Sequence, residues 1–325
     1  MQLPVDVNAL MNEVTDVQAA REMSLAVSVY IDETAPDDLA AHVRNAFASS
    51  SSLVRMTVTY IGESFTPHPT DDIAIVVAGE TGIAGEQAAA VRGVGVPTMV
   101  VTLEPGRIDR ISKGVNCPVP DGDIISPWGE EETGGEFDEK AADALNDRMG
   151  RWIVAVCTAK RLAFAAAFPF MRRPLAKDAV QVSALENAGI GLLSFIPGAD
   201  LPIMTLVQAK MVLQIAAAYG QEMGVERLKE VGAVVIGAYL SRGIARKLIA
   251  AVPVIGFVVR TGIAYGSTYA MGNAVIEYFE GGQNATGVAN VLERATGVGT
   301  KTVSSLQEKA TVVAPLVSKF TAKQE

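Results

Sequence analysis

The sequence is poor in the residues from which metal sites and nucleophilic sites are built. It has 325 residues but only 2 cysteines and 2 histidines. Cys117 and Cys157 show neither a disulfide framework nor the spacing of zinc ligands, which favours a reducing cytosol. His42 and His68 have no cysteine, serine or second histidine at ligand or triad spacing. Zinc chemistry and histidine-based nucleophilic catalysis therefore have no support in the sequence.

Targeting and membrane-spanning patterns are also missing. The first residues, MQLPVDVNALMNEV, contain no basic region followed by an apolar one, so we expect no signal peptide there. The most apolar run, Leu248–Val259, is twelve residues long and is interrupted by Pro253. Such a run is too short to cross about 30 Å of hydrocarbon. The chain is nevertheless 49% hydrophobic, with a mean hydropathy of +0.27, which is high for a soluble protein.

Charged residues are scarce and unevenly distributed. They make up 19% of the chain, whose net charge is −9, but residues 1–147 carry −17 whereas residues 148–280 carry +6. The acidic part argues against binding to nucleic acid. The apolar and basic middle part suits the anionic surface of a membrane. It equally suits a helical bundle that lysine and arginine side chains keep in solution.

The stretch Phe195–Gly220 predicts a turn followed by a long apolar helix. The signals for its ends are, in order, the turn residues Pro197 and Gly198, the N-cap Asp200, the first-turn Pro202 and the left-handed cap Gly220. One apolar stripe is expected to face a helical core: Met204, Val207, Met211, Ile215, Ala218 and Tyr219. Gln208 lies inside this stripe, so it either contacts a ligand or partner or is hydrogen-bonded by a neighbouring helix.

Residues 150–282 resemble a bacterial helical domain of unknown function. The resemblance rests on the PGADLP turn at Pro197–Pro202, on a second turn with Pro253 and Gly256, and on the closing segment Gly272–Phe279. That domain often follows a small GTPase domain, and it is similar to the C-terminal part of inner-membrane proteins of the YcjF type. The resemblance implies a helical domain associated with GTPases or GTPase-like domains and with membranes, and it implies no known reaction.

Residues 23–147 predict an α/β domain. Runs rich in β-branched residues alternate with helical segments, which is typical of βαβ units and a mainly parallel sheet. The expected strands are Leu25–Ile31, Val54–Ile61, Ile73–Ala78, Thr98–Leu103 and Ile124–Ile125. The expected helices are Pro36–Phe47 and Ile83–Val94, with further helices in residues 1–22 and 136–150.

The order of these elements resembles a small GTPase domain that lacks the nucleotide chemistry. By order, Asp71–Gly82 corresponds to the strand after the switch region, and Asp121–Trp128 to the last base-contacting strand. The loop Asp32–Asp38 lacks the G-x-x-x-x-G-K-[ST] motif, so it offers neither a glycine nest nor a lysine to phosphates. Thr102–Pro105 stands where the guanine-reading N-K-x-D would be. The resemblance implies a degenerate domain that binds no nucleotide, and a different Rossmann-like domain is the alternative.

The loop after the first strand contains four candidate metal ligands, Asp32, Glu33, Asp37 and Asp38. They are expected near the carboxyl end of a strand, where the sites of α/β proteins form. The alternative is an acidic helix N-terminus, which complements the helix dipole. A second loop, Gly79–Gly85, has the spacing G-x-x-G-x-x-G without a nearby basic residue, so we interpret it as a plain turn into a helix.

The apolar run Leu248–Val259, which basic residues flank, predicts a helix–turn–helix tip. Its turn contains Pro253 and Gly256, and it is either a buried hairpin or a wedge that enters a membrane. The residues expected to contact lipid or a protein partner are Arg242, Arg246, Lys247, Val254, Ile255, Phe257 and Arg260. In the tail, an apolar stripe over residues 303–320 predicts docking on the chain's own bundle or pairing with a partner helix or a second copy.

Together these features predict an N-terminal helix at 1–22, an α/β domain at 23–147, an all-α domain at 148–282 and a helical tail at 283–325. We expect a non-enzymatic scaffold or adaptor in the cytoplasm, peripheral to or embedded in the inner membrane. It would need no cofactor, bind no nucleic acid, and engage a membrane surface, a membrane protein or a GTPase. One alternative is a divergent nucleotide- or metal-dependent hydrolase that uses residues 32–38. Another is a soluble interaction protein that oligomerises through the tail.

Overall fold

A computed structural model describes residues 7–61, 65–128, 135–193, 201–221 and 256–281. The chain separates into two compact units. The α/β unit comprises Val17–Leu175 and Ala218–Gly220, and the helical unit comprises the remainder. The predicted combination of an α/β domain with further helices is confirmed.

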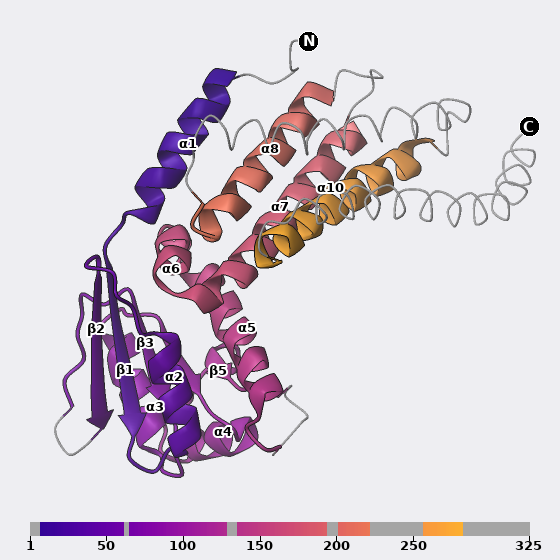
Figure 1. The fold of residues 1–325 in the computed structure, drawn as a ribbon. Coiled ribbons are helices and arrows are strands. Elements are labelled where there is room, and N and C mark those ends of the chain that lie inside the picture. The colour runs from indigo at the N-terminus through magenta and orange to yellow at the C-terminus, as the bar shows by residue number, and fades with distance from the viewer. Residues whose placement is uncertain (1–6, 62–64, 129–134, 194–200, 222–255, 282–325) are drawn as a thin grey trace, which may run out of the picture. The chain divides into compact units, whose positions relative to one another are not determined.

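The α/β unit is built on a sheet of five parallel strands in the order β2-β1-β3-β4-β5. The strands are β1 (Leu25–Asp32), β2 (Val54–Ile61), β3 (Ile73–Val77), β4 (Thr98–Val101) and β5 (Ile124–Ile125). β1 runs beside β2 from the pair Leu25–Val54 to the pair Asp32–Ile61 (Figure 1). This is the flavodoxin-like order, in which the chain winds first to one side of β1 and then to the other. All five predicted strands are present.

Helices cover both faces of the sheet. α2 (Asp37–Ala46) and α5 (Glu139–Val156) pack on one face, and α3 (Ile83–Gly93) and α4 (Pro105–Gly114) on the other. Every residue of β3 is buried, which explains its unbroken apolar run. The helix α4 was not predicted. In the structure, Pro105 lies in the first turn of α4, where its missing N–H costs no helical hydrogen bond.

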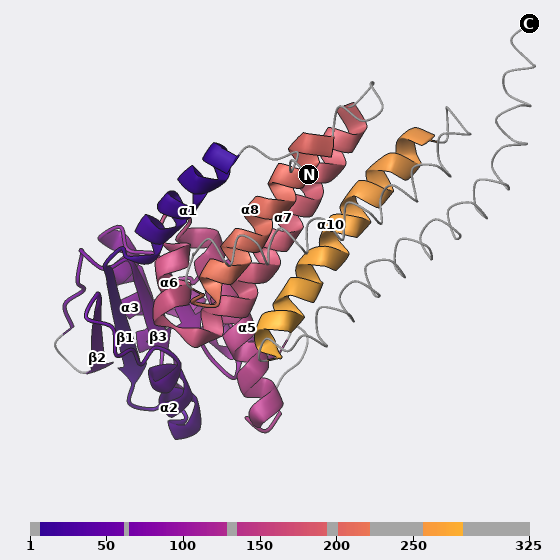
Figure 2. The ribbon, with the colours of Figure 1, turned by 45° about the horizontal axis from the view of Figure 1, so that its top comes forward.

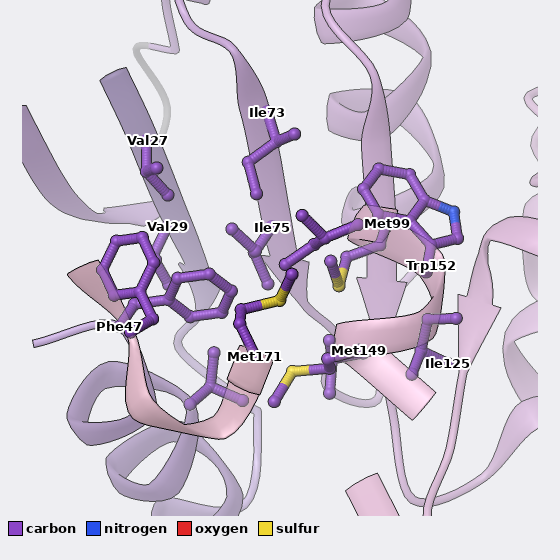
Figure 3. Packing of buried hydrophobic residues seen from close by; sticks show 14 of the residues in the cluster. Val27, Val29, Phe47, Ile73, Ile75, Met99, Ile125, Met149, Trp152 and Met171 are labelled. Atoms are coloured by element: carbon purple, nitrogen blue, oxygen red, sulfur yellow. The ribbon is translucent and has the colours of Figure 1, made fainter. Parts of the chain in front are cut away.

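The face under α2 and α5 carries the larger core. Alternate residues of β1 and β3 contribute to it, among them Val27, Val29, Ile73 and Ile75. Figure 3 shows methionines 99, 149 and 171 gathered between these strands and the covering segments. Phe47, which follows α2, meets Phe168 and Phe170 edge to face, with ring centroids 5.2 and 5.1 Å apart.

The helix after the sheet is longer than predicted and belongs to the α/β unit. Asp138 caps α5, and one face of the helix is buried in the core through Leu145, Met149 and Ile153. The compact α/β unit continues to Leu175. The change in net charge, from which the boundary between residues 147 and 148 was predicted, falls inside α5.

Lys160, which interrupts the apolar segment after α5, has a structural partner. Its Nζ lies 2.6 Å from Oδ1 of Asp72 and donates to the carbonyl of Ser24 at 2.9 Å. Asp72 also accepts from the N–H of Ala26 at 2.9 Å. The lysine thus connects the break between α5 and α6 (Arg161–Ala167) to the beginnings of the two central strands.

When only the sequence is read, Arg172, Arg173 and Pro174 predict the end of a helix, but in the structure they begin one. After the short helix η2 (Pro169–Met171), α7 begins at Arg172 and continues to Leu193. Pro174 therefore stands in the first turn, which proline tolerates. Its ring packs on Gly150 of α5, where an added Cβ would lie 2.5 Å from the Pro174 Cγ.

The helical unit contains α7 together with α8 (Leu201–Ala218) and α10 (Gly256–Glu280), which lie alongside one another in Figure 2. It also includes the first part of α1 (Val7–Arg21), the helix predicted within residues 1–22. A Cβ on Gly272 of α10 would lie 2.4 Å from Cγ2 of Val180 and 3.0 Å from Sδ of Met211. The glycine therefore permits close approach of the three helices.

The helix predicted after the PGADLP turn is present as α8. Gly220 has a φ of +75°, and the N–H of Gln221 donates to the carbonyl of Ala216 at 3.0 Å, as in a Schellman cap. The predicted apolar stripe is buried except for the half-buried Tyr219. Further residues are buried outside that stripe, including Val212 and Leu213, so α8 is enclosed more completely than the prediction required.

Gln208 is buried and hydrogen-bonded by a neighbouring helix, which was one of its two predicted roles. Its Nε2 donates to Oγ1 of Thr268 on α10 at 2.9 Å. Nδ2 of Asn187 on α7 donates to the same oxygen at 2.9 Å. All three residues are at most 1% exposed. We call Asn187, Gln208 and Thr268 the polar trio.

Several predictions lie outside the described residues. These are the turn Pro197, Gly198 and Asp200, the Pro253 turn, the residues Arg242, Arg246, Lys247, Val254 and Ile255, and the tail at 283–325. Pro202 is described as part of α8, and Gly256, Phe257 and Arg260 as part of α10.

Among the helices that the structure describes, none is both long enough and apolar enough to cross a membrane.

Candidate functional site

The topology places one candidate site between β1 and β3. Doubly wound sheets bind ligands outside the carboxyl ends of strands, at the point where the connections leave in opposite directions. Here β1 connects to β2 on one side, whereas β3 connects to β4 on the other. The loops at this point are residues 33–36 and 78–82, and the four predicted metal ligands lie within or beside the first.

Asp32, the last residue of β1, fills this position with its own carboxylate. Oδ1 accepts from the N–H of Thr34 at 2.9 Å and from its hydroxyl at 2.8 Å. Oδ2 accepts from the Thr81 hydroxyl at 2.7 Å and from the N–H of Gly79 at 3.3 Å. Loop N–H and hydroxyl groups of this kind bind anionic ligands in other α/β proteins. Asp32 therefore serves as an internal anion, and it is only 4% exposed.

The two loops approach closely enough to exclude a side chain at Gly79. An added Cβ would lie 2.2 Å from Oγ1 of Thr34 and 2.6 Å from the nitrogen of Ala35. Oγ1 of Thr34 in turn accepts from the N–H of Glu80 at 2.8 Å. The loop enters α3 at Ile83, as the plain-turn interpretation predicted.

The other three candidate metal ligands have separate positions. Asp37 and Asp38 occupy the first turn of α2, where negative charge complements the helix dipole. Oδ1 of Asp38 accepts from the N–H of Leu39 at 2.8 Å, and Glu33 is exposed. Within the described ranges, no three His, Cys, Asp or Glu residues are grouped to hold a metal ion. The acidic helix N-terminus is therefore favoured over the metal site.

A second candidate site is a pocket of about 610 Å³ at the β5 edge of the sheet. It lies among α4, the short helix η1 (Asp121–Asp123), β5 and α5. Its apolar lining includes Pro105, Ile124, Ile125 and Ala155. The volume is in the range of small-molecule sites. We call it the tryptophan pocket, because both tryptophans of the chain, Trp128 and Trp152, line it.

The two indoles are held in different ways. Trp152 is 7% exposed and belongs to the core, and Figure 3 shows its ring nitrogen turned away from Met99. That nitrogen donates to Oδ1 of Asp123 at 2.9 Å, which fixes the ring against η1. Trp128 follows β5 and is half-buried, and a Cβ on Gly135 would lie 3.1 Å from its ring nitrogen Nε1.

Four charged residues line the tryptophan pocket. Asp109 lies 2.7 Å from Nζ of Lys113, and Arg151 lies 3.1 Å from Asp147, each partner being on the same helix. Arg148 makes no hydrogen bond or ion pair with any residue in the described part of the chain. The fourth, Asp121, is exposed. Among the described residues, therefore, Arg148 is the basic lining residue without an acidic partner.

His42 and Cys157 each have a hydrogen-bond partner in the α/β unit. Nε2 of His42 lies 2.9 Å from Oδ1 of Asn146, so this histidine connects α2 with α5. Sγ of Cys157 donates to the carbonyl of Asp72 at 3.8 Å. Burial raises the Cys157 pKa to about 12. The negative charge of Asp72 adds to this rise, and the positive charge of Lys160 opposes it. The thiol is consequently protonated at neutral pH.

The sequence-based reasoning did not find the tryptophan pocket. Its residues come from four elements separated by up to 50 positions, and no spacing motif unites them. The sequence did contain one signal of the pocket: Trp128 closely follows the last predicted strand, and Trp152 closely follows the helix predicted after it.

Comparisons of this chain with protein-family models, with curated proteins and with solved structures found no match.

Proposed function

We propose that this protein is a non-enzymatic scaffold or adaptor that works at the cytoplasmic face of the inner membrane. The non-enzymatic part of the proposal rests mainly on Asp32. Its carboxylate takes up the four donors at the sheet position where an α/β enzyme would hold a ligand. The acidic loop, which was the best candidate for hydrolase chemistry, thereby has a structural explanation.

The membrane part of the proposal rests on composition. Residues 148–280 combine a net charge of +6 with long apolar stretches, whereas residues 1–147 carry −17. An anionic lipid surface attracts the first region and repels the second. The four basic residues expected to meet lipid phosphates are Arg242, Arg246, Lys247 and Arg260. The partner would be the lipid surface itself, a membrane protein, or a GTPase, as the resemblance of residues 150–282 implies.

Flotation with anionic liposomes tests the proposal. Full-length protein is mixed with vesicles at low and high salt and then washed with carbonate. Flotation that is lost in salt means peripheral electrostatic binding, and flotation that survives both treatments means insertion of the helical unit. If the protein remains unbound under every condition, the membrane proposal fails.

A matched pair of variants makes the test specific. Each basic residue close to an anionic surface contributes about 1 kcal/mol, so replacing Arg242, Arg246, Lys247 and Arg260 by glutamine should weaken binding about a thousandfold. The control replaces four exposed basic residues of the α/β unit, Arg44, Arg110, Lys113 and Lys140. If both quadruple variants lose binding equally, the attraction is non-specific and the assigned surface is wrong.

Ligand-dependent stabilisation separates the proposal from the hydrolase alternative. A ligand that binds only the native state raises its thermal stability. We expect no shift in the melting temperature with millimolar Mg²⁺, GTP or both. A shift that disappears in Asp32→Asn would support the hydrolase instead.

A further inference from the structure

We propose that the tryptophan pocket binds a small planar molecule that carries an anionic group, such as an aromatic carboxylate. This assignment concerns the α/β unit and is independent of membrane binding. It rests on the walls of the pocket, on its charges and on its volume.

The walls favour a flat ring. Two indoles line one pocket of about 610 Å³, and aromatic faces stack on planar π-systems. Trp152 is fixed by the core on one side and by Asp123 on the other, so its orientation costs little entropy on binding. The chain has only 2 tryptophans, and both are placed here.

The charges favour an anion. Among the four charged residues of the lining, Asp109 and Arg151 are engaged by oppositely charged neighbours, at 2.7 and 3.1 Å. The hydrogen bond to Asp109 raises the Lys113 pKa against the effect of desolvation, and the charges of Asp109 and Asp121 raise it further. Lys113 thus neutralises Asp109 as its ion-pair partner. The guanidinium of Arg148, half-buried and with no partner in the described part of the chain, matches the geometry of a carboxylate.

The helix α4 adds to this preference. Its first residues, Pro105 and Gly106, line the pocket, and no side chain caps its N-terminus at Glu104. The positive end of the helix dipole therefore lies at the pocket wall, which favours negative charge.

The two tryptophans also provide the assay. Since both line the pocket, all intrinsic tryptophan emission comes from it. Full-length protein is titrated with 2-naphthoate and with the neutral 2-naphthamide, and stoichiometry is measured by equilibrium dialysis. We expect saturable quenching at one site per chain, with naphthoate binding more tightly and weakening as salt is added, while naphthamide binding is insensitive to salt.

Variants separate the two parts of the assignment. Arg148→Gln should weaken naphthoate about tenfold or more, the value of a charge-assisted hydrogen bond, and leave naphthamide unchanged. Trp128→Leu should weaken both probes, and the emission of Trp152 remains as the signal. The control Arg110→Gln, on an exposed residue of α4 outside the lining, should change neither.

Two results would overturn the proposal. Quenching that rises linearly with probe concentration, with no bound probe in dialysis, means that the pocket is not a binding site. If wild type and Arg148→Gln bind naphthoate with the same affinity, and salt does not change that affinity, the guanidinium does not recognise the anion.

Discussion

Neutralising Asp32 should weaken the α/β unit, and the sign of this effect distinguishes a structural carboxylate from a metal ligand. Four clustered acids that await a metal repel one another, so replacing one of them by asparagine would stabilise the metal-free protein. Asp32 instead accepts four hydrogen bonds while only 4% exposed. Its replacement should therefore destabilise the native state.

The size of the effect can be worked out from the individual bonds. In Asp32→Ala, the N–H groups of Thr34 and Gly79 and the hydroxyl of Thr81 lose their acceptor. Unsatisfied donors cost about 1–3 kcal/mol each, and water can reach part of this loop, so we expect a loss of about 3 kcal/mol. In Asp32→Asn, Oδ1 is kept and the Thr81 hydroxyl can rotate to accept from the new amide. Only the 3.3 Å bond to Gly79 and the charge are lost, for about 1 kcal/mol.

Urea unfolding monitored by tryptophan emission measures this directly. Both tryptophans belong to the α/β unit, so the signal reports that unit even if the helical unit unfolds separately. With a slope of about 2 kcal/mol per molar urea, the midpoint should fall by about 1.5 M for the alanine variant and about 0.5 M for the asparagine variant. Asp38→Asn serves as the control, because Asp38 is exposed in the first turn of α2. A midpoint that rises in Asp32→Asn would refute the structural role.

Three further predictions concern packing and reactivity. Gly79→Ala should lower the free energy of unfolding by about 2 kcal/mol or more, because its Cβ would lie 2.2 Å from Oγ1 of Thr34. The control Gly114→Ala, whose Cβ meets nothing within 4 Å, should leave the free energy of unfolding unchanged. Equal effects of the two variants in urea titrations would contradict the prediction. Cys157 should react with iodoacetamide at pH 8 about a thousandfold more slowly in the native protein than in the unfolded protein, because burial raises its pKa from 9.0 to about 12 and so lowers the thiolate fraction. Peptide mass spectrometry measures the two alkylation rates, and similar rates would refute the prediction. Thr268→Val should cost about 2 kcal/mol, because the buried amide of Gln208 loses its acceptor and that of Asn187 keeps only the 3.4 Å bond to the Met204 carbonyl. The loss should appear as a lower melting temperature in the helical circular-dichroism signal; an unchanged temperature would mean that water replaces the hydroxyl.

The strands were predictable because their signal is local. Runs such as Ile73–Val77 consist of apolar, mostly β-branched residues, and a buried parallel strand needs no more than this. The helices that were missed or begun too late share a different cause. Pro105 and Pro174 resemble breakers when only the sequence is read, yet each lies in the first turn of a helix, where proline is tolerated. Whether a proline ends one helix or begins the next depends on the tertiary packing of the residues on either side of it.

The candidate sites depend on contacts that no local pattern encodes. The sequence correctly located acidic residues at the end of β1, but the partners of Asp32 come from Gly79 and Thr81, 47 and 49 residues further along the chain. The tryptophan pocket unites Pro105 with Trp152 in the same way. Residue types led to expectations about the chemistry, whereas only the fold showed which side chains meet.

The polar trio limits how the helical unit can be assembled. Helices rich in alanine, glycine and aliphatic residues can slide past one another by a turn of about 5.4 Å with little change in apolar contact. Such a shift would separate Thr268 from both Asn187 and Gln208, and the side chains of the trio would lose these hydrogen bonds inside an apolar interior. The hydrogen bonds of the polar trio therefore favour one alignment of α7, α8 and α10 among several that would bury a similar apolar area. A bundle with this composition could have had many arrangements, and three side chains select among them.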